Sequence, residues 1–98
     1  MVDLSRLTGF NWDKGNQDKN YHKHGVRAAE AEEAFLDKKA IILEDIAHSD
    51  QEQRFIWLGK TTKGKVLFVA FTIRKDKIRI ISARSANKKE RSRYAQKA

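Results

Sequence analysis

Four segments in the second half of the sequence are rich in β-branched and aromatic residues, and they constrain the fold more than any other feature. They read "AIILE", "RFIWLGK", "KVLFVAFTIR" and "KIRIISAR", a composition typical of β-strands. The polar links "TTKG" and "KD" between the last three segments are short. The last three segments are therefore expected to form an antiparallel meander.

Helical patterns flank these strands. "FNW" predicts a short first strand, and Asp13 is a good N-cap for a helix over about 14–24. That helix is expected to end at Gly25, because a left-handed C-cap residue is usually glycine. A second helix is predicted over about 27–36, and the closing residues 87–98 also have a helical composition. The predicted order is β-α-α-β-β-β-β-α, an α+β domain with helices packed on an antiparallel sheet.

Length and composition exclude several classes of protein. Ninety-eight residues predict a single domain over 1–98, with residues 1–9 as a loose leader. The absence of cysteine excludes disulfides, a cysteine nucleophile and a thiolate metal site. No apolar run approaches the roughly 20 residues of a membrane helix, and no signal-peptide pattern is present. We therefore expect a cytoplasmic protein with no membrane partner.

The net charge of +8 is confined to the end of the chain. From Arg74 to Ala98 there are ten Lys and Arg and two acidic residues, whereas the first 73 residues contain eleven of each. This asymmetry favours a polyanionic partner. A solvated basic surface without a ligand is the alternative.

Three polar clusters are candidate sites. In "DKNYHKHGV", His22 and His24 are two residues apart and face different sides of a helix, so a metal site is not expected. The cations there also complement the negative end of the helix dipole. In "HSDQEQR", a histidine, a carboxylate and an arginine lie at the entry of a strand, which suits acid–base chemistry beside an anion but also an ordinary polar loop.

The third cluster is "KIRIISARSANKKERSRY". Arg79 and Arg84 have opposite parity, so they share a face of the sheet only if Arg84 lies past the end of the strand. The helix that follows carries cations on two of its faces and one aromatic residue, Tyr94. Such a helix could bind a phosphate chain and stack a base, or it could be a solvated terminal helix.

Three segments together resemble one known family. "WDKGNQDKNYHKHGVRAAEAEEAF", "HSDQEQRFIWLGKTTKGKVLFVAFT" and "KIRIISARSANKKERSRY" are similar, in this order, to the opening, central and closing motifs of the BrnT toxin family. The resemblance covers about residues 10–94. The chain departs from it where the family often has Pro and Lys, since Lys14 and Asn16 stand near those places, and its leader is longer.

The resemblance implies a toxin of a type II toxin–antitoxin system. It implies a RelE-like fold, cleavage of RNA without a metal or other cofactor, and neutralisation by a BrnA-like antitoxin. The resemblance also implies that operator DNA is bound only through the toxin–antitoxin complex. Two alternatives are a non-catalytic nucleic-acid-binding module and an antitoxin-docking protein without activity.

A metal-free ribonuclease must deprotonate a 2′-hydroxyl, neutralise the charge of the phosphorane and protonate the leaving oxygen. For the phosphate we predict Arg54, Arg79 and Arg84, because arginine binds two phosphate oxygens at once. The candidate bases are His48 and Glu52. The candidates for an acid or a stacking group are Tyr94 and His24. The predicted RNA-binding residues are Lys23, His24, Lys88, Lys89, Arg91 and Arg93.

Overall fold

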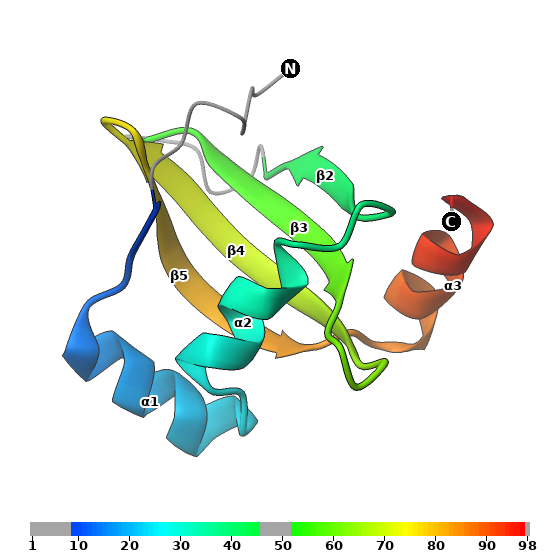
Figure 1. Cartoon of the computed structure of the whole chain (residues 1–98), viewed down its shortest axis with the longest axis horizontal. Helices are drawn as coiled ribbons and strands as arrows, with labels where there is room; N and C mark the ends of the chain where they lie inside the picture. Colours follow the sequence, from blue (N-terminus) through cyan, green and yellow to red (C-terminus); the bar gives the residue numbers. More distant parts are fainter. Residues whose placement is uncertain (1–8, 46–51, 98) are drawn as a thin grey trace.

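The computed structural model describes residues 9–45 and 52–97, which form a five-stranded sheet with helices on both faces (Figure 1). In chain order the elements are β1 (Gly9–Asn11), α1 (Lys14–His24), α2 (Ala28–Ala34), β2 (Ile41–Glu44), β3 (Arg54–Lys60), β4 (Val66–Arg74), β5 (Lys77–Ser85) and α3 (Lys88–Lys97). The predicted α+β class, with helices packed on a sheet, is confirmed.

The strand order in the sheet is β1-β5-β4-β3-β2. β2, β3, β4 and β5 pair antiparallel with one another in chain order, so the predicted meander is confirmed. β1 instead runs parallel to β5, with Gly9 opposite Lys77 and Asn11 opposite Arg79, and an antiparallel assignment for the whole sheet is wrong. No hairpin fixes the direction of β1, because α1, α2 and three strands separate it from its partner. Gly9, predicted to lie in the leader, belongs to this strand.

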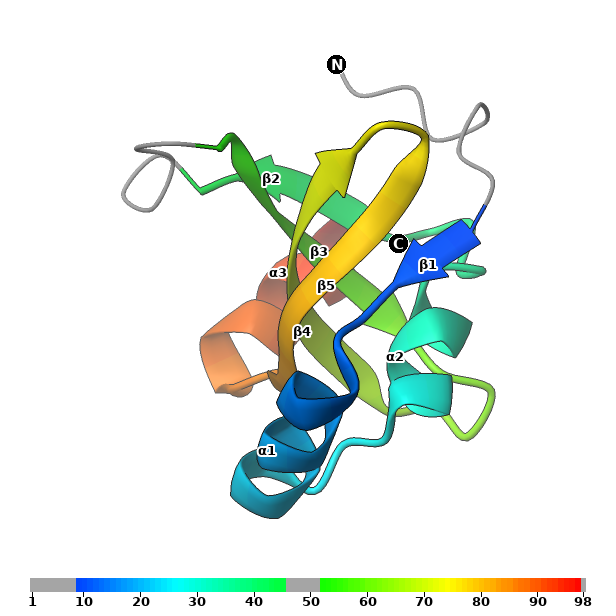
Figure 2. The same cartoon turned by 90° about the vertical axis from the view of Figure 1, so that its left-hand side faces the viewer.

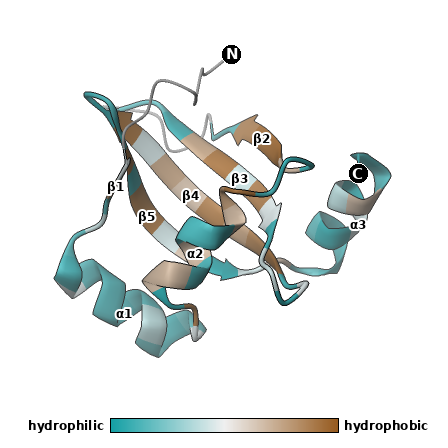
Figure 3. Cartoon of the chain, in the orientation of Figure 1, coloured by the Kyte–Doolittle hydropathy of each residue, from teal (hydrophilic) through white to brown (hydrophobic). Residues whose placement is uncertain are grey.

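The two faces of the sheet carry separate apolar cores. Odd-numbered residues of β4, such as Val69 and Phe71, pack with Ala31 of α2, whereas Ala70 packs on the other face with Tyr94 of α3. Figure 2 shows α3 behind the sheet, on the side away from α1 and α2. α1 and α3 are mostly hydrophilic (Figure 3). Polar contacts therefore have a large part in fixing both helices.

α1 begins and ends where the sequence predicts. The Oδ1 atom of Asp13 accepts a hydrogen bond from the N–H of Asn16 at 3.1 Å. Gly25 adopts a left-handed conformation with φ 71°, and its N–H donates to the carbonyl of Tyr21 at 2.8 Å. α2 ends at Ala34 and is therefore shorter than the predicted range of about 27–36.

α1 also completes the edge of β5. Asn20 is 5 % exposed, and its side-chain amide bonds both the N–H and the carbonyl of Ala83 at 2.9 Å. The Nδ2 atom of Asn16 donates to the carbonyl of Ile81 at 2.7 Å. Since β1 pairs only with residues 77–79 of β5, α1 satisfies the backbone groups further along the same edge.

Candidate functional site

A β-bulge in β5 decides which side chains share a face of the sheet. Ile80 pairs with Phe71, but the next pair along the strands joins Ser82 to Ala70. Ile81 is therefore an extra residue in β5. A bulge of this kind reverses the alternation of side chains beyond it.

The bulge brings Arg79 and Arg84 to the same face. Arg79 lies opposite Thr72 and Arg84 opposite Phe68, and these two β4 residues are four positions apart on one face. The prediction that they share a face only if Arg84 lies past the strand is wrong, because Arg84 lies within β5. Strict strand alternation, on which that prediction depended, does not hold across a bulge.

A row of polar residues crosses the sheet on the face that carries α3. Arg54 of β3 pairs with Thr72 of β4, which pairs with Arg79 of β5. We call Arg54, Thr72 and Arg79 the arginine row. The hydroxyl of Thr72 donates to the carbonyl of Gln53 at 2.8 Å, which connects the row to the chain that enters β3.

Glu52 lies beside the arginine row and is held by Arg74. The Nε and Nη2 atoms of Arg74 each bond one carboxylate oxygen of Glu52 at 2.8 Å. This bidentate hydrogen bond is the main cause that lowers the pKa of Glu52, and the charges of Arg79 and Arg54 lower it further. A carboxylate in this setting accepts a proton less readily. The other candidate base, His48, lies outside the described residues.

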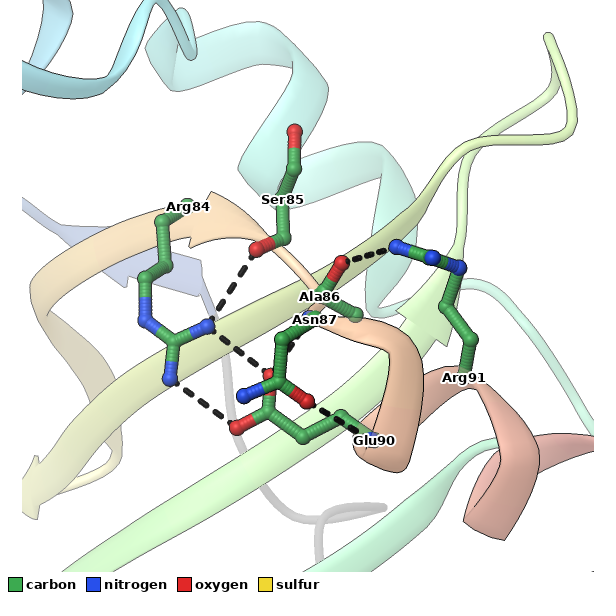
Figure 4. A network of polar contacts seen from close by, with 6 residues as sticks. All are labelled: Arg84, Ser85, Ala86, Asn87, Glu90 and Arg91. Atoms are coloured by element: carbon green, nitrogen blue, oxygen red, sulfur yellow. Dashed lines mark hydrogen bonds and ion pairs between the residues drawn. The ribbon is translucent and has the colours of Figure 1, made fainter.

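Arg84 has a different setting, at the junction of β5 and α3 (Figure 4). Its two terminal nitrogens bond the two carboxylate oxygens of Glu90 at 2.8 and 2.9 Å, and its guanidinium lies 3.9 Å from the centre of the Phe68 ring. Asn87 and Glu90 also form a reciprocal capping box. Burial alone would raise the pKa of Glu90, but the bonds from Arg84 and the Asn87 N–H outweigh it and lower that pKa.

Tyr94 fixes the C-terminal half of α3. The ring is 5 % exposed, its hydroxyl donates to Oδ2 of Asp37, and the ammonium of Lys60 lies 5.5 Å from the ring centre. Burial, followed by the bond to Asp37, raises the pKa of Tyr94 to about 12. At neutral pH the phenol therefore keeps its proton. These contacts of the Tyr94 side chain join α3 to the loop that follows α2.

The predicted RNA-binding cations lie in two separate places. Lys23 and His24 end α1, which contacts β5, whereas α3 contacts β3 near the opposite edge (Figure 1). The structure therefore does not bring these two residues to the cations of α3. On α3 a hollow of about 950 Å³ is lined by Lys88, Lys89 and Arg93. The remaining cation, Arg91, instead donates to the carbonyl of Ala86 at 2.6 Å.

Sequence reasoning missed Arg74 and Asp37. Arg74 has the same parity on β4 as Thr72, so strand alternation could have placed it near the arginine row. Asp37 carries no comparable signal, since its partner Tyr94 is 57 residues away in the chain. Within residues 9–45 and 52–97, no cluster of three or more His, Cys, Asp or Glu could hold a metal ion. No helix among them is long and apolar enough to cross a membrane.

Comparison with known proteins places this architecture in a family. The family model described as the ribonuclease toxin BrnT of type II toxin–antitoxin systems matches residues 12–90. Among solved structures, the fold is similar to the Brucella abortus ribonuclease toxin BrnT, with a TM-score of 0.64 and 21 % sequence identity. That match covers 84 % of this chain and 100 % of the Brucella chain. No curated protein matches the sequence. The chain belongs to the BrnT family of ribonuclease toxins from type II toxin–antitoxin systems.

Proposed function

We propose that this protein is a metal-independent endoribonuclease that cleaves RNA by attack of a ribose 2′-hydroxyl, with its reaction centre at the arginine row. The observation that carries the proposal is the placement of Arg54 and Arg79 on one face of the sheet, on either side of Thr72. Membership of a ribonuclease toxin family supports the reaction class.

The spacing of the row suits one phosphate group. Neighbouring strands lie roughly 4.8 Å apart, so the backbones of Arg54 and Arg79 are separated by about 10 Å across β4. Two arginine side chains can span that distance from both sides. Preorganised guanidinium groups would stabilise the additional negative charge of a phosphorane, as oxyanion-binding groups do.

The remaining roles follow from how each side chain is held. Arg74 binds the carboxylate of Glu52 and lowers the pKa of Glu52, which makes Glu52 a weak base. We therefore assign the general base to His48, by residue type. Arg84 is engaged by Glu90, so we propose that it positions α3 beside the reaction centre. Tyr94 is engaged by Asp37 and has an anchoring role, and we assign no proton donor among the described residues.

The partners follow from the family and from the basic C-terminal region. A type II toxin has an antitoxin partner, and we propose that this antitoxin is BrnA-like and that operator DNA is bound only through the complex. Lys88, Lys89, Arg91 and Arg93 would contact the RNA backbone outside the reaction centre. We further propose that the fold is RelE-like and that the protein acts in the cytoplasm, where its RNA substrate is present.

The test is RNA cleavage in the presence of EDTA by the wild type and by Arg54→Ala and Arg79→Ala. The wild type should release fragments with a 5′-hydroxyl, and each variant should be slower by about 10²–10³-fold, as is common when one preorganised charge donor is removed. Arg79→Lys should rescue poorly, because an ammonium cannot bind two oxygens in the same geometry. The matched control is Arg27→Ala, an exposed arginine at the start of α2.

Two results would contradict the proposal. Wild-type rates in both arginine variants would remove the arginine row from the reaction centre. Activity that EDTA abolishes and magnesium restores would exclude the metal-free mechanism. Binding of RNA without any cleavage would favour the second function, a non-catalytic nucleic-acid-binding module.

A further inference from the structure

The hollow between α3 and the sheet has an apolar floor and a basic wall. The floor consists of Leu43, Leu58 and Phe68, from three neighbouring strands. Leu43 and Phe68 are only partly buried, so apolar surface remains open to a ligand. The α3 residues that line it are Asn87, Lys88, Lys89, Glu90, Ser92, Arg93 and Gln96. We call this hollow the α3 groove.

We propose that the α3 groove is the docking site of the antitoxin, and that it takes an acidic amphipathic segment of that protein. The inference rests on the antitoxin partner of the proposed function and adds the site and the chemistry of the contact. It does not depend on the catalytic roles assigned to the arginine row.

The charge on the wall of the groove favours an acidic partner. Lys88, Lys89 and Arg93 are exposed. The carboxylate of Glu90 is paired with Arg84, so it does little to offset them. Aspartate or glutamate side chains of a partner would therefore meet an excess of positive charge.

The floor of the groove favours a protein over RNA. Leu43 and Leu58 are aliphatic and offer no ring for stacking a base, while the Arg84 guanidinium lies 3.9 Å from the centre of the Phe68 ring. RNA binding depends on phosphate contacts and on stacking. A protein segment with one apolar and one acidic face complements both the floor and the wall, in the way that amphipathic helices occupy hydrophobic grooves.

The groove is held open by contacts at both ends of α3. Arg84 and Glu90 join the start of the helix to β5, and Tyr94 and Asp37 join its second half to the loop after α2. Because the groove is already ordered, binding of a partner does not include the free-energy cost of ordering it.

A protein segment bound in the α3 groove would also hinder the binding of RNA. The groove floor at Leu58 and the arginine row at Arg54 lie on the same face of the sheet, four residues apart along β3. At about 3.3 Å per residue this is a separation of roughly 13 Å. An antitoxin seated in the groove would therefore cover the wall cations and reach the approach to the row.

The first experiment separates the groove from simple charge attraction. Lys88, Lys89 and Arg93 are replaced together by glutamate, and the control replaces the exposed Lys14, Lys19 and Lys38 by glutamate, which changes the net charge equally. Affinity for the antitoxin, produced from the neighbouring reading frame, is measured by titration calorimetry. We expect the dissociation constant to rise at least about 100-fold in the groove variant, roughly 2.8 kcal/mol at about 1.4 kcal/mol per tenfold change. In the control it should rise less than about 5-fold, because surface charges are screened within roughly 8 Å.

The second experiment tests occupancy of the groove without changing its charge. The chain has no cysteine, so Gln96→Cys and Ala95→Cys each offer one thiol for a bulky neutral maleimide. Gln96 lines the groove, whereas exposed Ala95 does not and points about 100° away around the helix. The adduct at position 96 should prevent antitoxin binding, and the adduct at position 95 should leave it within about 3-fold of the wild type. Circular dichroism checks that every variant is folded.

The outcomes separate this inference from the proposed function, because RNA cleavage is measured on the same proteins. Antitoxin affinity that falls equally in both charge variants, or that survives the adduct at position 96, would overturn the groove as the docking site. An adduct that reduces RNA cleavage but leaves antitoxin affinity unchanged would identify the groove as an RNA site and would also overturn the inference. Loss of antitoxin affinity only in the groove variants supports it, whether or not the protein cleaves RNA.

Discussion

At the scale of single residues, Asn20 connects α1 to the sheet. It is a polar side chain in a buried position, and its amide replaces a neighbouring strand for both backbone groups of Ala83. It also donates to the carbonyl of Val26 at 3.4 Å. Because α1 is mostly hydrophilic, this contact has a large share in fixing the helix against β5.

Replacing Asn20 by alanine should destabilise the fold by about 2–4 kcal/mol, since each buried backbone group left without a partner costs roughly 1–3 kcal/mol. Urea unfolding followed by circular dichroism measures the change. The control is Lys19→Ala, one position earlier on the exposed side of α1, which should alter stability by no more than about 0.5 kcal/mol. A cost below about 1 kcal/mol for Asn20→Ala would mean that water replaces the amide.

At the scale of elements, the sequence predicted what local rules determine. The first helix, its caps at Asp13 and Gly25, and the meander depend on residues close together in the chain, and the structure confirms them. The bulge at Ile81 was not predicted, because nothing in the surrounding apolar run marks an extra residue. The shared face of Arg79 and Arg84 could not be found without it.

The anchoring of α3 was also beyond local reasoning, because Tyr94 and Asp37 meet only in the folded chain. Burial alone would raise the pKa of Asp37. The hydrogen bonds donated by Tyr94 and by the backbone N–H groups of Lys60 and Lys39 outweigh it, so the pKa of Asp37 is lowered. The sequence predicts Tyr94 as a site residue, whereas in the structure its contacts anchor α3 to the loop that follows α2.

Replacing Tyr94 by phenylalanine should reduce stability at neutral pH by about 1–2 kcal/mol, because the hydrogen bond to a charged group disappears while the ring stays buried. Because the pKa of Tyr94 is raised, the contribution of its hydroxyl to the free energy of unfolding is present below pH 10 and is lost as the pH rises toward about 12. The lowered pKa of Asp37 means that its contribution is lost as the pH falls below its ordinary value of 3.8.

The stability difference between the wild type and Tyr94→Phe should therefore be largest between about pH 5 and pH 9 and shrink on both sides. Urea unfolding at a series of pH values measures it. Tyr21→Phe, at an exposed tyrosine of α1, is the control and should change stability by less than about 0.5 kcal/mol. A difference that stays constant from pH 3 to pH 12 would show that Tyr94 acts through packing alone.

At the scale of the whole molecule, the excess charge has a defined location. The final 25 residues, which carry the whole balance of +8, comprise the end of β4, β5 and α3. In the fold these elements supply Arg79 of the arginine row and the basic wall of the α3 groove. The proposed RNA-binding surface and the proposed antitoxin site therefore share one basic region, and we propose that the antitoxin inhibits by competing with RNA for it.

The salt dependence of RNA affinity should therefore come from the cations of α3 and not from the net charge of the whole protein. Replacing Lys88, Lys89, Arg91 and Arg93 together by glutamine should flatten the slope of log K against log salt by up to about 3, at roughly 0.7 for each phosphate of a single strand that the protein no longer neutralises. The matched control replaces Lys14, Lys19, Lys38 and Lys39, exposed lysines of the neutral first part of the chain, and should leave the slope within about 0.7 of the wild type. Fluorescence anisotropy with a 2′-O-methyl oligonucleotide, which lacks the attacking hydroxyl, measures binding without cleavage. Equal flattening in both variants would mean that RNA responds to the total charge of the protein, and the basic C-terminal region would lose its role as the RNA-binding surface.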